Sequence, residues 1–233
     1  MEVAAATEQR RPIKETPLER LGRETAALVG SLARTIGLSL VLVPLLIAGL
    51  LTIDIPVHAL DHYASNAVLR PSQWLTRGGV LLALAPMLVV LFARRYGGDV
   101  AASVVTTAWT FCALLAFAEI AYLAPQLNET DFPKTQFVIG VVSSAMVSQY
   151  VAAGVYDVIR GGGRWWRAPL YALLIAFGIQ LVIYYPIVYW GANVPSAHWF
   201  VAEFSVKAAM SLGFLALYFL LRHRLKPKRG FGG

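Results

Sequence analysis

Six long apolar segments constrain the fold of this 233-residue chain more than any other feature. A bilayer hydrocarbon core is about 30 Å thick, and roughly 20 predominantly apolar residues cross it as an α-helix. Stretches that are more polar or basic separate the apolar segments. The segments are residues 36–55, 78–93, 100–123, 137–159, 168–191 and 200–222. We therefore predict an all-α, polytopic integral membrane protein with six transmembrane helices.

The distribution of basic residues predicts how these helices are oriented. The chain has 20 Lys and Arg against 13 Asp and Glu, and most of the basic residues fall where alternating spans would place them on one side. They are Arg10, Arg11, Lys14, Arg20, Arg23, Arg34, Arg94, Arg95, Arg160, Arg164, Arg167, Arg222, Arg224, Lys226, Lys228 and Arg229. Short basic loops stay in the cytoplasm, so we predict two cytoplasmic termini. Anionic lipid is the expected partner of this charge, and nucleic acid is not, because aromatic residues are not interleaved with it.

The chain divides into three predicted parts. Residues 1–34 form a polar cytoplasmic arm, residues 35–225 a six-helix transmembrane domain, and residues 226–233 a basic cytoplasmic tail. The arm carries leucines at roughly helical spacing, at Leu18, Leu21, Leu28 and Leu32. This spacing predicts an amphipathic helix that lies on the membrane surface before the first span.

Between the first two spans, residues 56–74 are too polar to cross the membrane. Apolar residues recur there at helical spacing, at Val57, Leu60, Ala64 and Val68, so we expect a short interfacial helix on the outer face. His58, Asp61 and His62 fall on the same proposed helix, and this spacing would let two imidazoles bind one metal ion. A third ligand is not evident, so we expect structural or surface roles for these residues and no metal. Phosphate-loop, dinucleotide and nucleophile-elbow motifs are also absent, so we predict neither an enzyme nor a cofactor.

Two charged residues inside the segment 200–222 are the strongest candidates for a functional site. Glu203 and Lys207 are four residues apart with the acid first, so they share one helix face and can pair. A charge at the centre of a membrane helix costs roughly 2.5–3.5 kcal/mol on insertion scales, which favours an inward-facing site or a partner. The alternative is proximity to the outer surface, where Glu203 reaches water and Lys207 extends its ammonium group toward the interface.

Four further polar residues are candidates. Gln149 and Gln180 lie near the middle of two spans, where an amide either bonds a neighbouring helix or binds a ligand. Tyr184 belongs to an aromatic cluster whose rings could stack on a planar heterocycle. Glu119 lies about one turn inside the outer end of its span. Interfacial exposure explains Glu119, and it is also a candidate for proton coupling.

The second half of the chain carries a series of short pieces in a definite order. They are Ser148-Gln149, Tyr156, Arg160, Arg164-Trp165-Trp166, Ala168-Pro169, Tyr189-Trp190, His198-Trp199, Glu203 and Lys207. In order and spacing, over roughly residues 137–225, they resemble the VUT family of six-helix membrane proteins, also called queuosine precursor transporters. The first half is similar only in hydropathy and in the basic, glycine-containing turn after residue 93.

The resemblance implies a bundle related to the substrate-binding subunits of energy-coupling vitamin transporters. It also implies multi-pass insertion in the bacterial inner membrane and import of 7-deazaguanine bases. Carried over residue by residue, it places Gln149, Glu203 and Lys207 near the substrate cavity. The sequence departs from the family pattern where polar or acidic residues are usual, at Pro86, Ala152, Phe177 and Gln180.

These departures leave two functions open. The first is a transporter of a small planar solute, with Gln149, Gln180, Tyr184, Glu203 and Lys207 as substrate-binding residues. A ligand with many polar edges would bind poorly where those acids are missing, because an unpaired buried polar group costs about 1–3 kcal/mol. The alternative is therefore a non-transporting accessory or assembly subunit of a membrane complex. The expected partners are lipid, a small molecule, and either a second copy of the chain or other subunits.

Overall fold

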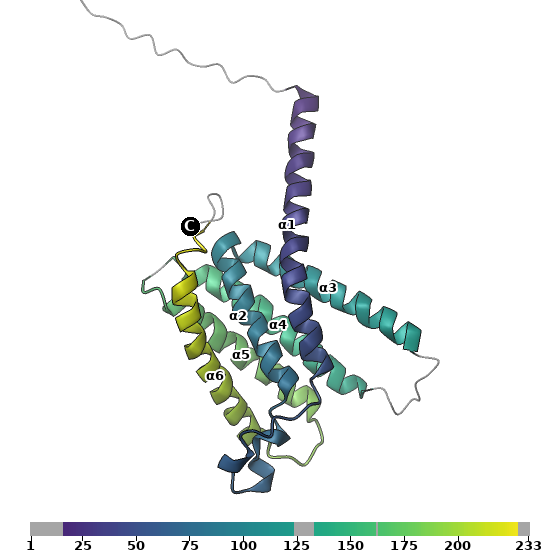
Figure 1. The fold of residues 1–233 in the computed structure, drawn as a ribbon, viewed down its shortest axis with the longest axis vertical. Helices are drawn as coiled ribbons and strands as arrows, with labels where there is room; N and C mark the ends of the chain where they lie inside the picture. The colour runs from purple at the N-terminus through teal and green to yellow at the C-terminus, as the bar shows by residue number, and fades with distance from the viewer. Residues whose placement is uncertain (1–15, 124–132, 162, 228–233) are drawn as a thin grey trace, which may run out of the picture. The chain divides into compact units, whose positions relative to one another are not determined.

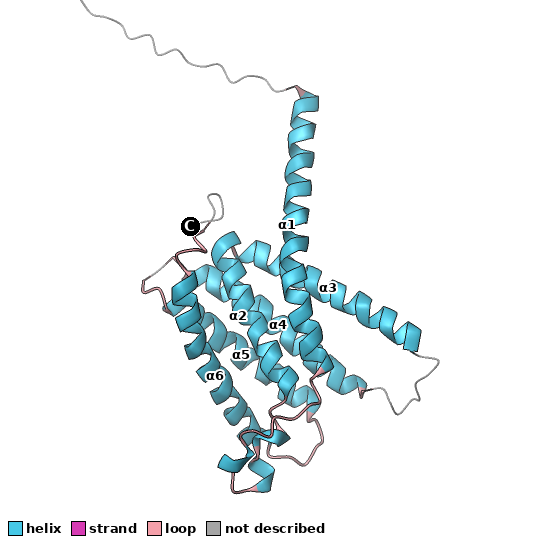
Figure 2. Ribbon diagram, in the orientation of Figure 1, coloured by secondary structure: helices cyan, strands magenta, loops and turns pink. Residues whose placement is uncertain are grey.

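The computed structural model of the chain describes residues 16–123, 133–161 and 163–227. Across these residues the structure contains six α-helices and three short 3₁₀ turns, and no β-strand (Figure 2). All six α-helices are long and apolar enough to cross a membrane. The prediction of an all-α chain with six such helices is therefore confirmed.

Five of the six predicted spans agree closely with the observed helices, whereas the helix that contains the first span already begins at Pro17. The helices are α1 (Pro17–Leu51), α2 (Arg77–Tyr96), α3 (Gly98–Leu123), α4 (Thr135–Ile159), α5 (Arg167–Val188) and α6 (Ser196–Leu221). The predicted spans at 36–55 and 168–191 run a few residues past the ends of α1 and α5. Apolar residues such as Ile53 and Trp190 continue into the following turns, so hydropathy alone places these two ends too late.

The chain separates into two compact units, Met1–Arg34 and Thr35–Gly233. In the first unit, residues 17–34 are helical, and the four leucines of the predicted amphipathic stripe are exposed. Thr16 and Glu19 cap this helix reciprocally: the Glu19 amide donates to Thr16 Oγ1 at 3.3 Å, and the Thr16 amide donates to Glu19 Oε2 at 2.9 Å. The rest of the predicted arm, residues 1–15, lies outside the described residues.

Within the second unit, α2 is the central helix and contacts α3, α4, α5 and α6 (Figure 1). In the most apolar stretch of α2, 56% of the residues are buried by protein, whereas in that of α6 only 22% are buried. Small residues allow the close packing. A Cβ on Gly78 would lie 2.1 Å from the carbonyl oxygen of Gly49, so α1 and α2 can approach this closely only with glycine there. Gly78 at the start of α2 is thus required by packing.

The connection between α1 and α2 corrects one prediction. Residues 57–68 do not form the expected α-helix; the segment is irregular, with 3₁₀ turns at Asp61–Tyr63, Ala67–Leu69 and Pro71–Gln73. Side-chain oxygens accept hydrogen bonds from backbone amides that would bond to carbonyl oxygens in an α-helix. The Asn66 side chain accepts from the Val68 amide at 3.0 Å, and Asp61 Oδ1 accepts from the Ser72 amide at 2.9 Å. Such local bonds compete with helix formation.

Basic residues in the last turn of α2 and just beyond the ends of α4 and α6 meet at one end of the second unit, which we call the basic end. Arg94 at the end of α2 donates to the Arg222 carbonyl oxygen at 2.9 Å, beyond the end of α6. The Arg222 guanidinium lies 5.3 Å from the Trp165 ring centroid, in the turn between α4 and α5. Basic residues that the sequence pattern predicts to lie on one side of the membrane thus lie at one end of this unit. Its cytoplasmic orientation stays a prediction from the positive-inside rule.

Candidate functional site

A buried polar network joins α5 and α6 near the end of the unit opposite the basic end. Glu203 and Lys207 are both buried, and Lys207 Nζ lies 2.8 Å from Glu203 Oε1. Their spacing of four residues puts both on the inner face of α6, as the sequence predicts. Lys207 Nζ also donates to Gln180 Oε1 of α5 at 3.0 Å. The structure therefore brings three of the predicted site residues together.

Tyr185 completes this network. Its hydroxyl donates to Glu203 Oε2 at 2.9 Å, so both carboxylate oxygens have partners. A buried ion pair is tolerated only when its geometry is good and its remaining polar atoms are satisfied. Sequence reasoning singled out Tyr184 and not Tyr185. Helical geometry offered a weak signal, since neighbouring residues point in directions about 100° apart and only one can face Glu203.

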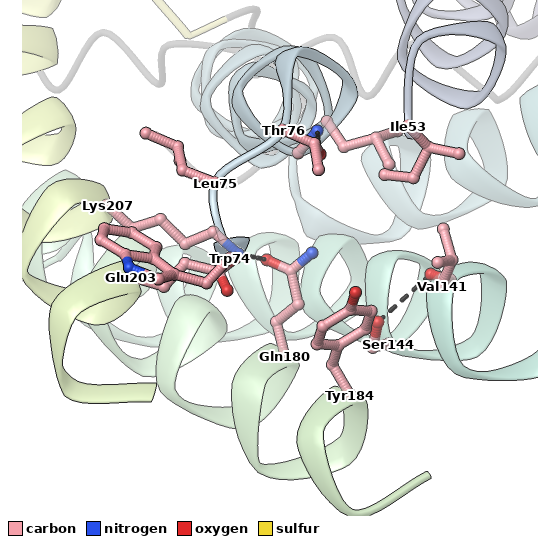
Figure 3. Close-up of a pocket in the computed structure, with 12 residues that line it drawn as sticks. Ile53, Trp74, Leu75, Thr76, Val141, Ser144, Gln180, Tyr184, Glu203 and Lys207 are labelled. Carbon is pink, nitrogen blue, oxygen red and sulfur yellow. Dashed lines mark hydrogen bonds and ion pairs between the residues drawn. The ribbon is translucent and has the colours of Figure 1, made fainter. Parts of the chain in front are cut away.

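The Gln180 amide group is oriented by Lys207. An ammonium group only donates, so the amide oxygen must face it and the amide nitrogen must point elsewhere. Figure 3 shows the Gln180 nitrogen turned away from Lys207, and it makes no hydrogen bond within the described residues. Gln180 Nε2 is therefore a donor open to a ligand.

A small cavity adjoins the network. Its walls come from α2, α4, α5, α6 and the segment before α2, and they include Ser144, Gln180, Tyr184, Glu203 and Lys207 (Figure 3). The cavity volume is about 30 Å³. That is about the share of one water molecule in the liquid, whereas drug-sized ligands occupy sites of roughly 300–1,000 Å³. The space is thus too small for such a ligand in this structure, and we call it the closed cavity.

The connection between α1 and α2, which we call the covering segment (residues 52–76), closes the cavity. Trp74, Leu75 and Thr76 line it directly. Backbone bonds tie the ends of the segment to each other and to α2: the Val57 amide donates to the Leu75 carbonyl at 3.0 Å, and the Arg77 amide donates to the Ile55 carbonyl at 2.8 Å. Its middle is joined to α6 by the Trp199 indole, which donates to the Val68 carbonyl at 2.9 Å. Segments with little regular structure open at the lowest free-energy cost.

Asp61 stabilises the fold of the covering segment. The hydrogen bond from the Ser72 amide, with a smaller contribution from His58, holds the pKa of Asp61 below its ordinary value. His58 Nδ1 lies 3.0 Å from Asp61 Oδ2, whereas the His62 ring packs against Tyr63. Throughout the described ranges, no three His, Cys, Asp or Glu side chains lie close enough to hold a metal ion.

Gln149 is buried away from the cavity. Its Oε1 accepts from the Trp109 indole at 3.2 Å, so it joins α4 to α3. Gln149 Nε2 is buried and hydrogen-bonds to no described residue. The residue does not line the cavity that Gln180 lines, although both amides lie mid-span in the sequence.

Glu119 also lies apart from the network. It is on the exposed C-terminal half of α3, and it lines none of the cavity. Two of the departures noted in the sequence, Ala152 and Phe177, are buried; Ala152 is inaccessible, and the Phe177 ring centroid lies 5.7 Å from Lys207 Nζ. An apolar ring therefore lies beside the buried cation.

Comparisons of this chain with protein-family models, with curated proteins and with solved structures found no match.

Proposed function

We propose that the chain is a membrane carrier for a small, planar, polar solute, which binds in the cavity between α2, α4, α5 and α6. The observation that carries the proposal is the buried network of Glu203, Lys207 and Gln180 beside a closed cavity. Intramembrane charges are costly and are retained mainly at substrate or ion pathways. A pair that served structure alone would need no cavity and no open amide donor beside it.

The covering segment provides the gate in this mechanism. A cavity of about 30 Å³ admits no heterocycle, so residues 52–76 must move before a substrate enters. Once inside, a planar ring would stack on Tyr184 and accept from Gln180 Nε2. The Glu203–Lys207 pair would orient the ligand by offering one negative and one positive group at its edge. Closure of the covering segment would then exclude water from the site.

For the substrate itself, 7-deazaguanine bases are the first ligands to test, because the second half of the sequence resembles the queuosine precursor transporters. The same resemblance supports a bacterial inner-membrane location and a bundle related to vitamin-transporter binding subunits. The positive-inside rule supports two cytoplasmic termini. Phe177 reduces the number of polar groups available, which favours bases with fewer polar edges over guanine.

Uptake into proteoliposomes tests the proposal. Purified protein is reconstituted, and accumulation of a radiolabelled 7-deazaguanine base is compared with empty liposomes and with the double variant Glu203→Gln/Lys207→Met. This variant removes both charges at similar side-chain volume, so folding is retained better than in a single variant. We expect uptake by the natural chain and loss in the double variant. Uptake no faster than that of the double variant, for a panel of planar heterocycles, would refute carrier function.

One observation favours the second function, an accessory subunit of a membrane complex. From residue 113 to 122, every residue of α3 is exposed, including Leu114, Phe117 and Tyr122. A membrane helix that is exposed on all sides faces either lipid or a partner helix. Extraction in mild detergent, followed by native mass spectrometry, distinguishes the two. A stoichiometric protein partner supports the accessory role, and a chain that carries only lipid counts against it.

A further inference from the structure

A second pocket lies at the basic end, far from the charge pair along α6. Its walls come from the last turns of α2, α4 and α6, from the connection between α4 and α5, and from the first turn of α5. The cavity volume is about 210 Å³, several times the share of one water molecule, about 30 Å³. The polar residues that line it are Arg94, Tyr156, Arg160, Arg164 and Tyr218. We call it the arginine pocket.

The charge in the arginine pocket has one sign. Three arginines line it, and the described lining includes no carboxylate. Asp157 neutralises one of them, because its Oδ1 lies 3.2 Å from Arg160 Nε. Arg164 is exposed at the mouth. At least two positive charges therefore face this space without an acidic partner in the lining.

Arg94 has only neutral partners. It donates to the Tyr218 hydroxyl at 2.7 Å and to the Arg222 carbonyl at 2.9 Å, and its Nε is buried without an acceptor among the described residues. The bond to the Arg222 carbonyl has a structural explanation, because it caps the C-terminal end of α6. Helix capping does not explain why Arg94 Nε is buried without an acceptor. The free-energy cost of such an unsatisfied donor is larger for a charged group than for a neutral one.

Other donors converge on the same space. The buried Tyr156 and Tyr218 hydroxyls lie 2.8 Å apart at its base. The first turn of α5 begins beside it. Its Arg167 amide donates to the Arg164 carbonyl oxygen at 3.1 Å and Pro169 has no N–H, so at most the Ala168 amide is open to an anion. Helix N-termini attract anions, and guanidinium groups match the geometry of phosphate oxygens. Trp165 lines the mouth, and tryptophan is enriched at the depth of lipid headgroups.

We infer that the arginine pocket binds a phosphate group, held by Arg94 and Arg164 and by whichever of the two tyrosine hydroxyls does not donate to the other. Two sources carry this chemistry: the headgroup of an anionic phospholipid and a soluble phosphate ester. In the proposed orientation the pocket opens at the cytoplasmic leaflet, where both are found. The inference is independent of the carrier proposal, because the pocket shares no lining residue with the closed cavity.

The test compares two arginines at the same end of the molecule. Arg164 lines the pocket, whereas Arg95 does not; Arg95 lies near the Arg224 carbonyl oxygen and the Tyr96 ring. Arg164→Gln and Arg95→Gln remove the same charge, so they weaken general attraction to an anionic surface equally. Native mass spectrometry measures retention of phosphatidylglycerol and of phosphatidylcholine by the full chain. In a second arm, glycerol phosphate competes with phosphatidylglycerol.

We expect selective retention of phosphatidylglycerol, weakened roughly tenfold by Arg164→Gln, as for loss of one charge-assisted hydrogen bond, and unchanged by Arg95→Gln. Arg164→Lys should restore part of the binding. If glycerol phosphate displaces phosphatidylglycerol, the site is assigned to a soluble phosphate ester. If it does not, the site is assigned to lipid. Equal loss in Arg164→Gln and Arg95→Gln, or equal retention of both lipids, would overturn the inference. Arg94→Gln serves as a second pocket variant where it folds.

Discussion

The two ends of the bundle treat buried charge in opposite ways. At the closed cavity, the carboxylate of Glu203 and the ammonium of Lys207 neutralise each other, and Tyr185 and Gln180 satisfy further polar atoms. At the arginine pocket, charges of one sign surround an open space, and Arg94 has only neutral partners. The first arrangement is neutral within itself, and in the proposed carrier it must open before it acts. In our further inference, an anion from outside completes the second.

The difference between the two ends shows two ways in which a membrane protein can keep charged side chains stable. Within the hydrocarbon region, no water compensates a lone ion, so the protein must provide its counter-charge. Near the headgroups, water and anionic lipid are available, so a cluster of one sign is tolerated. Four experiments test this comparison.

The largest expected effect comes from breaking the charge pair on one side only. Lys207→Met leaves Glu203 buried without its counter-ion, which should lower the free energy of unfolding by about 3–5 kcal/mol. Glu203→Gln/Lys207→Met removes both charges and should cost much less. Arg164→Gln, at the exposed mouth of the arginine pocket, should change stability by less than about 0.5 kcal/mol. Denaturant unfolding in detergent measures all three. Equal stability of the single and double variants would contradict mutual neutralisation.

The second experiment compares the two mid-span amides. Gln180→Leu removes the donor that faces the cavity and should reduce solute uptake roughly tenfold, whereas Gln149→Leu should leave uptake nearly unchanged. Gln149→Leu should instead affect stability, because it breaks the bond from Trp109 and also removes a buried unsatisfied nitrogen. Uptake assays and unfolding of the same preparations separate these effects. Equal loss of uptake in both variants would mean that the cavity does not define the binding site.

A smaller effect is expected at the covering segment. Trp199→Phe removes the indole donor to the Val68 carbonyl, a bond worth about 1 kcal/mol, so opening should become about fivefold more frequent. The buried residue Leu75 reports this when it is changed to cysteine in a Cys112→Ala background. The rate of labelling by a water-soluble thiol reagent measures opening. Trp190→Phe is the control, since Trp190 is exposed and does not line the cavity. Unchanged labelling in Trp199→Phe would show that this bond does not hold the segment closed.

The smallest effect concerns pH. The Ser72 amide lowers the pKa of Asp61, so the ionised carboxylate stabilises the folded segment. This contribution is complete above the ordinary aspartate pKa of about 3.9 and is lost as the pH falls through the lower pKa of the folded state. Thermal unfolding of the natural chain should therefore shift to lower temperature over that acidic range, by slightly more than in Asp61→Asn. Identical pH profiles would show that Asp61 contributes nothing to stability.

The sequence predicted several parts of the site because their geometry is local. Glu203 and Lys207 pair through the helical repeat alone, so their spacing predicted the contact that the structure contains. The irregular covering segment was not predictable from its apolar spacing. Asn66 and Asp61 take up backbone amides through their side chains, and this competition does not appear in a hydrophobic pattern. The arginine pocket was visible only as a charge bias, since its three helix ends are far apart along the chain.

Hydropathy and length determined that the chain is all-helical with six segments able to cross a membrane. The cost of an unsatisfied backbone in lipid forces each apolar segment to bond internally, so its helical state depends on its own residues. Only the tertiary structure decided which polar side chains meet. Gln149 and Gln180 look equivalent in the sequence, yet one bonds Trp109 and the other bonds Lys207 beside the cavity. The rotation of each helix about its axis is set by packing with its neighbours, above all around α2, and no local pattern contains that information.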